Sequence, residues 1–128
     1  MAKIFLVSHG EMSLEVLKSA EMIIGHQEDI KAIPFYSHES REQLMSKIEE
    51  ELDNQKKEHY LIMVDLKGGT PFNASILLSK KYNITVVTGL NLPILLEAIT
   101  MIQTVKSSEE LTDIIVQVGK NSIEKIKL

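Results

Sequence analysis

The chain has 128 residues, of which 44% are hydrophobic and 25% are charged, and these values fit one compact domain over residues 1–128. Fourteen basic against 18 acidic residues give a net charge of −4, which leaves no basic field to hold nucleic acid. The sequence contains no cysteine and no apolar stretch typical of a signal peptide or a membrane span. We therefore expect a cytoplasmic domain without disulfides.

Apolar runs and helical patterns alternate along the chain, as they do in βαβ units. The apolar runs cover residues 4–7, 30–35, 61–64 and 84–87. Most of them are continuous in Val, Ile and Leu, which is typical of strands covered on both faces. The pattern predicts an α/β fold with a single open, mainly parallel sheet and helices on both faces. Four methionines are expected to fill gaps in its core, namely Met22, Met45, Met63 and Met101.

The helices between these runs are marked by capping residues and by glycines. Apolar residues at helical spacing over 14–24 predict a helix that Gly25 ends in a left-handed cap. Residues 40–43 are typical of a capping box for a second helix, and Thr70 is expected to cap a third. A last helix is expected to start near residue 107 and to end at Gly119.

The last residues, 122–128, fit neither the helical nor the strand period well. We expect them to form a short edge strand that can pair with a neighbouring subunit. Together with an apolar helix that follows residues 88–93, this tail predicts a homodimer with a largely apolar interface.

One histidine, His9, stands where the first predicted strand ends. In an open α/β sheet, ligands bind at the carboxyl ends of the strands. The other histidines fall at a helix end, in a polar loop and in a charged stretch, and we interpret them as surface or structural residues: His26, His38 and His59. His9 is therefore the candidate catalytic histidine.

Asp65 follows the strand predicted at 60–64, so parallel pairing brings it to the same edge of the sheet as His9. A neutral imidazole nitrogen is nucleophilic near neutral pH. A carboxylate that accepts a hydrogen bond from Nδ1 fixes the tautomer that leaves Nε2 free to attack, and it stabilises a cationic phosphorylated ring. Asp65 alone could equally form a turn through its side chain, but its placement beside His9 favours a catalytic role.

A glycine turn opens the third helix, at Gly68, Gly69 and Thr70. Amide groups at a helix start hold the spread negative charge of a phosphoryl group, and glycine lets the main chain approach it closely. The Thr70 hydroxyl can donate to a phosphate oxygen. With Gly10, these residues form the predicted phosphate-binding set. No metal or other cofactor is expected, because no carboxylate or thiol cluster with ligand spacing accompanies the histidine.

At these residues the chain resembles the IIA domains of the mannose class of the bacterial sugar phosphotransferase system (PTS). The blocks that carry the resemblance are VSHG at 7–10, DLKGGTPFNA at 65–74 and TGLNLP at 88–93. Together with the order of the elements they cover essentially the whole chain. Glu11 and Met12 fall where the family varies, and Lys67 stands where other members can carry an aromatic residue. We interpret these positions as tuning partner contacts.

The resemblance implies a phosphotransferase component in which His9 accepts a phosphoryl group from the phosphohistidine carrier HPr. It implies that Nε2 carries the phosphate, that Asp65 bonds Nδ1, and that a IIB domain receives the group for sugar uptake. The family's dimers can exchange a C-terminal strand, and the membrane is reached only through the IIC and IID transporter. Met12, Phe35 and Phe72 are expected to flank the pocket, in a docking surface for HPr and IIB.

Other functions remain open at this point. Related phosphocarrier domains serve dihydroxyacetone kinase, which would keep the chemistry and change the client. A receiver-like signalling module would use Asp65 as the phosphoacceptor, but it needs acidic residues after the first strand to bind magnesium, and Ser8 and His9 stand there. A pure interaction domain without phosphotransfer is the remaining class. Residues 68–73 and 89–93 favour the sugar system.

Overall fold

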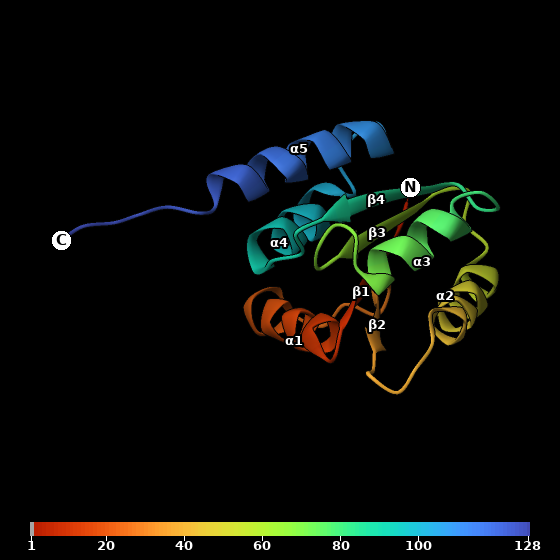
Figure 1. Cartoon of the computed structure of the whole chain (residues 1–128). Coiled ribbons are helices and arrows are strands. Elements are labelled where there is room, and N and C mark those ends of the chain that lie inside the picture. The colour runs from red at the N-terminus through yellow and green to blue at the C-terminus, as the bar shows by residue number, and fades with distance from the viewer. Residues whose placement is uncertain (1) are drawn as a thin grey trace.

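Four parallel strands form the central sheet, in the order β2-β1-β3-β4 (Figure 1). The structure is a computed structural model and describes residues 2–128. The strands are β1 (Lys3–His9), β2 (Lys31–Phe35), β3 (Tyr60–Val64) and β4 (Ile84–Thr88). Each predicted apolar run forms a strand, and the open, parallel α/β sheet is confirmed.

The register of the sheet brings the ends of β1 and β3 together. Val7 pairs with Val64 across these two strands, and His9 pairs with Phe35 at the end of β2. The chain that leaves β3 after Val64 is therefore level with the last residues of β1. The residues that follow β1, β2 and β3 thus lie together at the carboxyl end of the sheet, which is where ligands bind in open α/β folds.

Residues 2–128 form five helices, four of which cover the two faces of the sheet. The five are α1 (Met12–Ile24), α2 (Arg41–Gln55), α3 (Thr70–Leu78), α4 (Leu92–Met101) and α5 (Ser108–Asn121). Figure 1 shows α1 and α4 on one face and α2 and α3 on the other, and α5 packs on α4. Successive residues of β1 point to opposite faces, so Ile4 and Leu6 join the core under α1 and α4, while Phe5 and Val7 join the other. No helix within residues 2–128 has the length and apolar character to cross a membrane.

Side-chain caps begin three of these helices. Ser40 and Gln43 form the capping box predicted for α2, with hydrogen bonds of 2.8 and 3.1 Å to each other's main-chain N–H groups. Asn91 caps α4 and Ser107 caps α5, each by accepting a main-chain N–H of the first turn. By contrast, no side chain within residues 2–128 caps the start of α3.

The predictions for Gly25, Gly119 and Met22 are wrong. Gly25 ends α1, but with φ 90° and ψ 173° rather than in the left-handed helical conformation. Gly119 does not end α5, which continues past it; a Cβ atom at 119 would lie 2.9 Å from Ile94, so glycine lets α5 pack closely on α4. Met22 is 87% exposed, because two positions along a helix rotate it about 200° away from the buried Ala20.

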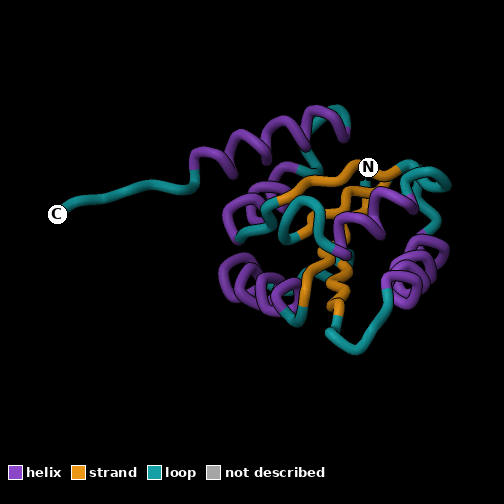
Figure 2. Tube along the Cα trace, in the orientation of Figure 1, coloured by secondary structure: helices purple, strands orange, loops and turns teal. Residues whose placement is uncertain are grey.

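The chain after α5 has no regular structure. Residues 123–128 lead away from the body of the molecule as a tail (Figure 2). Its apolar side chains are largely exposed, at Ile123, Ile126 and Leu128. The exchange of this tail as an edge strand in a dimer therefore stays a prediction.

Candidate active site

His9 and Asp65 lie side by side at the carboxyl end of the sheet, where β1 and β3 end. The Oδ2 atom of Asp65 accepts two hydrogen bonds, from the main-chain N–H of His9 at 2.9 Å and from its ring Nδ1 at 2.7 Å. The other carboxylate oxygen accepts the main-chain N–H of Leu66 at 2.9 Å. The side chain of Asp65 is 11% exposed and that of His9 is 47% exposed. The carboxylate is thus fixed, while part of the imidazole ring stays open to solvent.

These hydrogen bonds decide the charge of Asp65 and the tautomer of His9. Burial alone would raise the pKa of Asp65, but the bonds from the main chain and ring of His9, the charge of that ring and the Leu66 N–H together hold this pKa below its usual value. Asp65 is therefore an ionised acceptor near neutral pH. In the neutral form of the His9 ring, Nδ1 then carries the donated proton, which leaves the lone pair of Nε2 free.

Gly69 lies directly against the imidazole ring. A Cβ atom at this position would stand 2.7 Å from Cε1 of His9 and 3.4 Å from Nε2, so only glycine fits without displacing the ring. The φ of Gly69 is −79°, which any residue can adopt, so the close approach is what requires glycine here. Gly68 differs, since its φ of 88° itself favours glycine.

Helix α3 begins beside the same ring. Gly69 is its N-cap and Thr70 is its first residue, so the prediction that Thr70 caps the helix is wrong. The glycine that passes the ring occupies the cap position instead. The first N–H groups of a helix have no partners within it, and helix N-termini of this kind bind anions. The structure therefore brings Gly68, Gly69 and Thr70 together next to His9.

The end of β2 bounds the ring of His9 on its other side. The Phe35 ring meets the imidazole edge-on, with centroids 5.9 Å apart, at a position predicted to flank the pocket. Gly10 has a φ of 55° and donates its main-chain N–H to the Phe35 carbonyl at 2.7 Å. The four residues predicted to bind phosphate thus lie on two sides of His9, with Gly10 toward β2 and the other three after β3.

Two contacts near His9 have no counterpart in the sequence predictions. The buried hydroxyl of Ser8 accepts the main-chain N–H of Ser13 at 2.7 Å, in the first turn of α1. The hydroxyl of Tyr36 donates to Oε2 of Glu11 at 2.8 Å. The partners are 5 and 25 positions apart, and no local pattern marks either pair.

The other three histidines do not join the pair. His26 follows α1 and lies 2.9 Å from a glutamate of that helix. His59 lies at the start of β3, where its Nε2 is 2.9 Å from Oγ1 of Thr85 and burial lowers its pKa. His38 is exposed and stacks on Tyr36. No group of three or more His, Cys, Asp or Glu side chains suited to a metal ion is found within residues 2–128.

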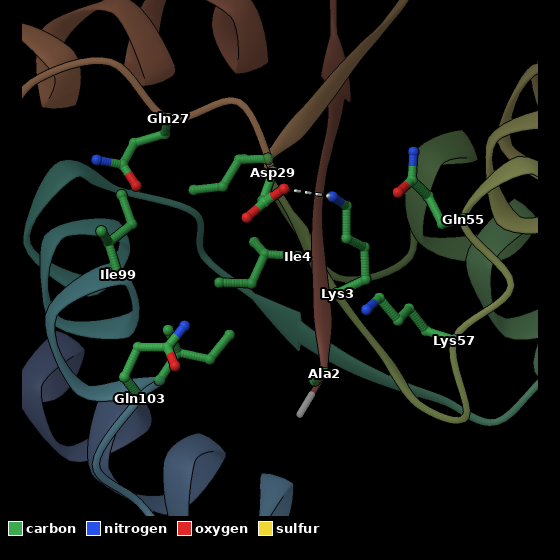
Figure 3. Close-up of a pocket in the computed structure, with 11 residues that line it drawn as sticks. Ala2, Lys3, Ile4, Gln27, Asp29, Gln55, Lys57, Ile99 and Gln103 are labelled. Atoms are coloured by element: carbon green, nitrogen blue, oxygen red, sulfur yellow. Dashed lines mark ion pairs between the residues drawn. The ribbon is translucent and has the colours of Figure 1, made fainter.

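A cavity of about 630 Å³ lies at the opposite end of the sheet, where the strands begin (Figure 3). Lys3 and Asp29 form an ion pair of 3.5 Å on its wall. The seven residues of β1 run from Lys3 to His9, and a strand of this length spans about 20 Å. The cavity is therefore separate from His9 and Asp65.

The fold and the site define a class of protein. It is a parallel α/β domain in which a carboxylate orients a half-exposed histidine beside a glycine turn. Comparison with known proteins supplies the family. The family model described as PTS system fructose IIA component matches residues 3–116. The chain belongs to this family of EIIA components, which confirms the resemblance found in its sequence.

Relatives of known name and structure agree with this family. The fructose-specific EIIA component of Bacillus subtilis (strain 168) is 32% identical over 103 residues, which are 79% of this chain and 70% of that protein. The mannose-specific EIIAB component of Escherichia coli (strain K12) is 32% identical over 126 residues, or 97% of this chain, but the chain spans only 39% of that protein's length. The crystal structure of an EIIA component from Streptococcus agalactiae has a TM-score of 0.91 at 34% identity, covering 98% of this chain and 97% of that one.

Proposed function

We propose that this chain is a phosphocarrier of the sugar phosphotransferase system. His9 accepts a phosphoryl group on Nε2 from phospho-HPr and passes it to a IIB domain for sugar uptake. The observation that carries the proposal is the 2.7 Å contact between Nδ1 of His9 and Asp65, which leaves Nε2 open beside Gly69. Residues 1–128 act as one EIIA domain, and the cytoplasm is the expected compartment.

The transfer step exchanges one N–P bond for another. The Nε2 lone pair of His9 attacks phosphorus, the N–P bond of the phosphohistidine donor breaks, and its electron pair returns to the donor ring. The proton on Nδ1 stays between His9 and Asp65. The ring gains positive character as the new bond forms, and the ionised carboxylate at 2.7 Å stabilises it. Transfer to IIB breaks the Nε2–P bond in the same way.

The glycine turn supplies neutral donors for the phosphoryl oxygens. Gly69 lets the main chain pass close to the reacting ring, and the N–H groups at the start of α3 carry partial positive charge. The Thr70 hydroxyl does not cap the helix, so it is free to donate to a phosphoryl oxygen. The N–H of Gly10 already donates to Phe35, so Gly10 contributes by shaping the turn after His9.

The proposal includes a homodimer in which residues 122–128 are exchanged between subunits. β4 is an edge strand whose outer side pairs with no strand within residues 2–128. A groove of about 460 Å³ beside it is lined by apolar residues of β4, α4 and α5, including Val86, Val87, Ile94, Ile115 and Val116. The exposed apolar tail of a second copy has the chemistry to fill this groove and to extend the sheet.

The alternative functions fit the site less well. A receiver-like module needs acidic side chains after β1 for magnesium, and Ser8 there is buried and bonded to α1. A carrier for dihydroxyacetone kinase would share the chemistry of His9, but the relatives described above carry the names of fructose and mannose systems. The sugar phosphotransferase system is therefore the function that the site and the family support best.

Incubation with HPr, its kinase and phosphoenolpyruvate tests the proposal by intact-mass measurement. The parent chain is expected to gain one acid-labile phosphoryl group, and His9→Ala is expected to gain none. His26→Ala and His38→Ala are controls that keep labelling, because both side chains are exposed. Full labelling of His9→Ala would refute the site. An unlabelled parent chain would instead be an interaction domain without phosphotransfer.

A further inference from the structure

A carboxylate close to His9 along the chain is tied to the end of β2. Glu11 is the N-cap of α1, yet its side chain does not cap the helix. Its Oε2 atom instead accepts a hydrogen bond from the Tyr36 hydroxyl at 2.8 Å. Only Gly10 separates Glu11 from His9, so an unrestrained carboxylate here would bring negative charge toward Nε2.

Tyr36 is itself held in place by its neighbours. Its main-chain N–H donates to Oε1 of Glu39 at 2.8 Å. Its ring stacks on His38 with planes 6° apart, and Nζ of Lys47 lies 5.5 Å from the ring centroid. The hydrogen bond to Glu11, followed by burial and by the charges of Glu11 and Glu39, raises the pKa of Tyr36. The hydroxyl therefore stays protonated and directed at Glu11.

The order of the strands determines on which side of His9 this hydrogen bond lies. β2 and β3 flank β1 on opposite sides. Tyr36 follows β2, whereas Asp65, Gly69 and the start of α3 follow β3. Tyr36 thus draws the Glu11 carboxylate to the side of His9 that is away from the proposed phosphoryl-binding turn.

We propose that Tyr36 is a positioning residue that keeps the Glu11 carboxylate away from the phosphoryl group on His9. The inference rests on the proposed function, since it concerns the same transfer at Nε2. A carboxylate about 4 Å from one phosphoryl charge in water slows transfer about fivefold, and salt screens this repulsion. Loss of the Tyr36 hydroxyl releases the charge, whereas loss of the Glu11 charge removes the need for Tyr36.

Rapid-quench transfer from phospho-HPr to Tyr36→Phe, Glu11→Gln and the double variant tests this inference. Tyr36→Phe keeps the ring and is expected to accept the phosphoryl group about fivefold more slowly at low salt. At about 1 M salt it is expected to recover most of the parent rate. Glu11→Gln keeps an acceptor for the hydroxyl without the charge and is expected to be at least as fast as the parent chain. The double variant is expected to match Glu11→Gln.

Tyr82→Phe is the matched control, because the Tyr82 hydroxyl also donates to carboxylates, those of Glu49 and Asp53, but between α2 and the loop that follows α3. This variant is expected to transfer at the parent rate. Circular dichroism confirms that each variant is folded.

The outcomes separate this inference from the proposed function. A parent chain that is phosphorylated, with Tyr36→Phe at the parent rate, overturns the inference and leaves the proposed function intact. Equal slowing by Tyr36→Phe in the Glu11→Gln background, or slowing that salt does not relieve, assigns Tyr36 a structural role and also overturns it. A parent chain that accepts no phosphoryl group defeats the proposed function and this inference together.

Discussion

Replacing Gly69 by alanine tests the tightest contact at the site. The added Cβ atom would lie 2.7 Å from Cε1 of His9. Two carbon atoms pack best at about 3.5 to 4.0 Å, so the imidazole ring has to move by about 1 Å. The 2.7 Å hydrogen bond from Nδ1 to Asp65 cannot keep its geometry through such a shift.

The consequence for transfer is larger than the consequence for stability. A misplacement of about 1 Å at a reacting group costs about 10²-fold in rate, and we expect Gly69→Ala to accept phosphoryl groups from phospho-HPr more slowly by this factor. Overpacking costs about 1 to 3 kcal/mol, and the φ of −79° adds no main-chain strain. The variant is therefore expected to fold. Rapid-quench transfer measures the first effect, and thermal unfolding followed by circular dichroism measures the second.

Gly119→Ala is the matched control for this prediction. Its Cβ atom would meet Cγ2 of Ile94 at 2.9 Å, where α5 packs on α4, so a packing cost is expected, offset in part by the better helix propensity of alanine. Its transfer rate is expected to equal that of the parent chain. A folded Gly69→Ala protein that transfers as fast as the parent would refute the reasoning, because the ring would not depend on this contact.

The remaining predictions concern Asp65 and the tail. Asp65→Ala is expected to keep the nucleophile but to slow rapid-quench transfer about 10²- to 10⁴-fold; a folded variant at the parent rate would reduce Asp65 to a turn-forming residue. Because the folded pKa of Asp65 is lowered, its stabilising contribution is present above the unfolded pKa of about 3.9 and is lost as the pH falls through the folded pKa. The free energy of unfolding, measured in urea across this pH range, should depend less on pH for Asp65→Asn than for the parent chain. Removal of residues 122–128 is expected to weaken the homodimer in sedimentation, whereas a concentration-independent monomer of the intact chain would contradict the dimer.

The placement of His9 beside Asp65 follows from local features of the sequence. Continuous apolar runs mark where β1 and β3 end, and parallel pairing sends both ends to one edge of the sheet. The pairing of Val7 with Val64 then leaves Asp65 beside the last residues of β1. The capping box at Ser40 is confirmed for a similar reason, since it depends on a few consecutive residues.

Local features of the sequence do not indicate contacts between segments that are far apart in the chain. The Thr70 hydroxyl has the chemistry of a helix cap, but the main chain passes so close to His9 that Gly69 occupies the cap position. Thr70→Ala is therefore not expected to lose the stability of a helix cap. The hydrogen bond from Tyr36 to Glu11 joins residues 25 positions apart. Such contacts depend on how the elements pack, which apolar periodicity does not determine.

The two glycines of the turn act for different physical reasons, although the sequence presents them alike. Gly68 has a φ of 88°, and within residues 2–128 no heavy atom beyond Gly68 and its two chain neighbours lies within 4 Å of where its Cβ would stand. A side chain there costs main-chain strain of about 1 to 3 kcal/mol and meets no part of the His9 ring. Gly69 has an ordinary φ and no room beside the ring. Gly68→Ala is therefore expected to lose stability and to be slowed less than Gly69→Ala, and unfolding and transfer measured on both variants separate the shape of the turn from its contact with His9.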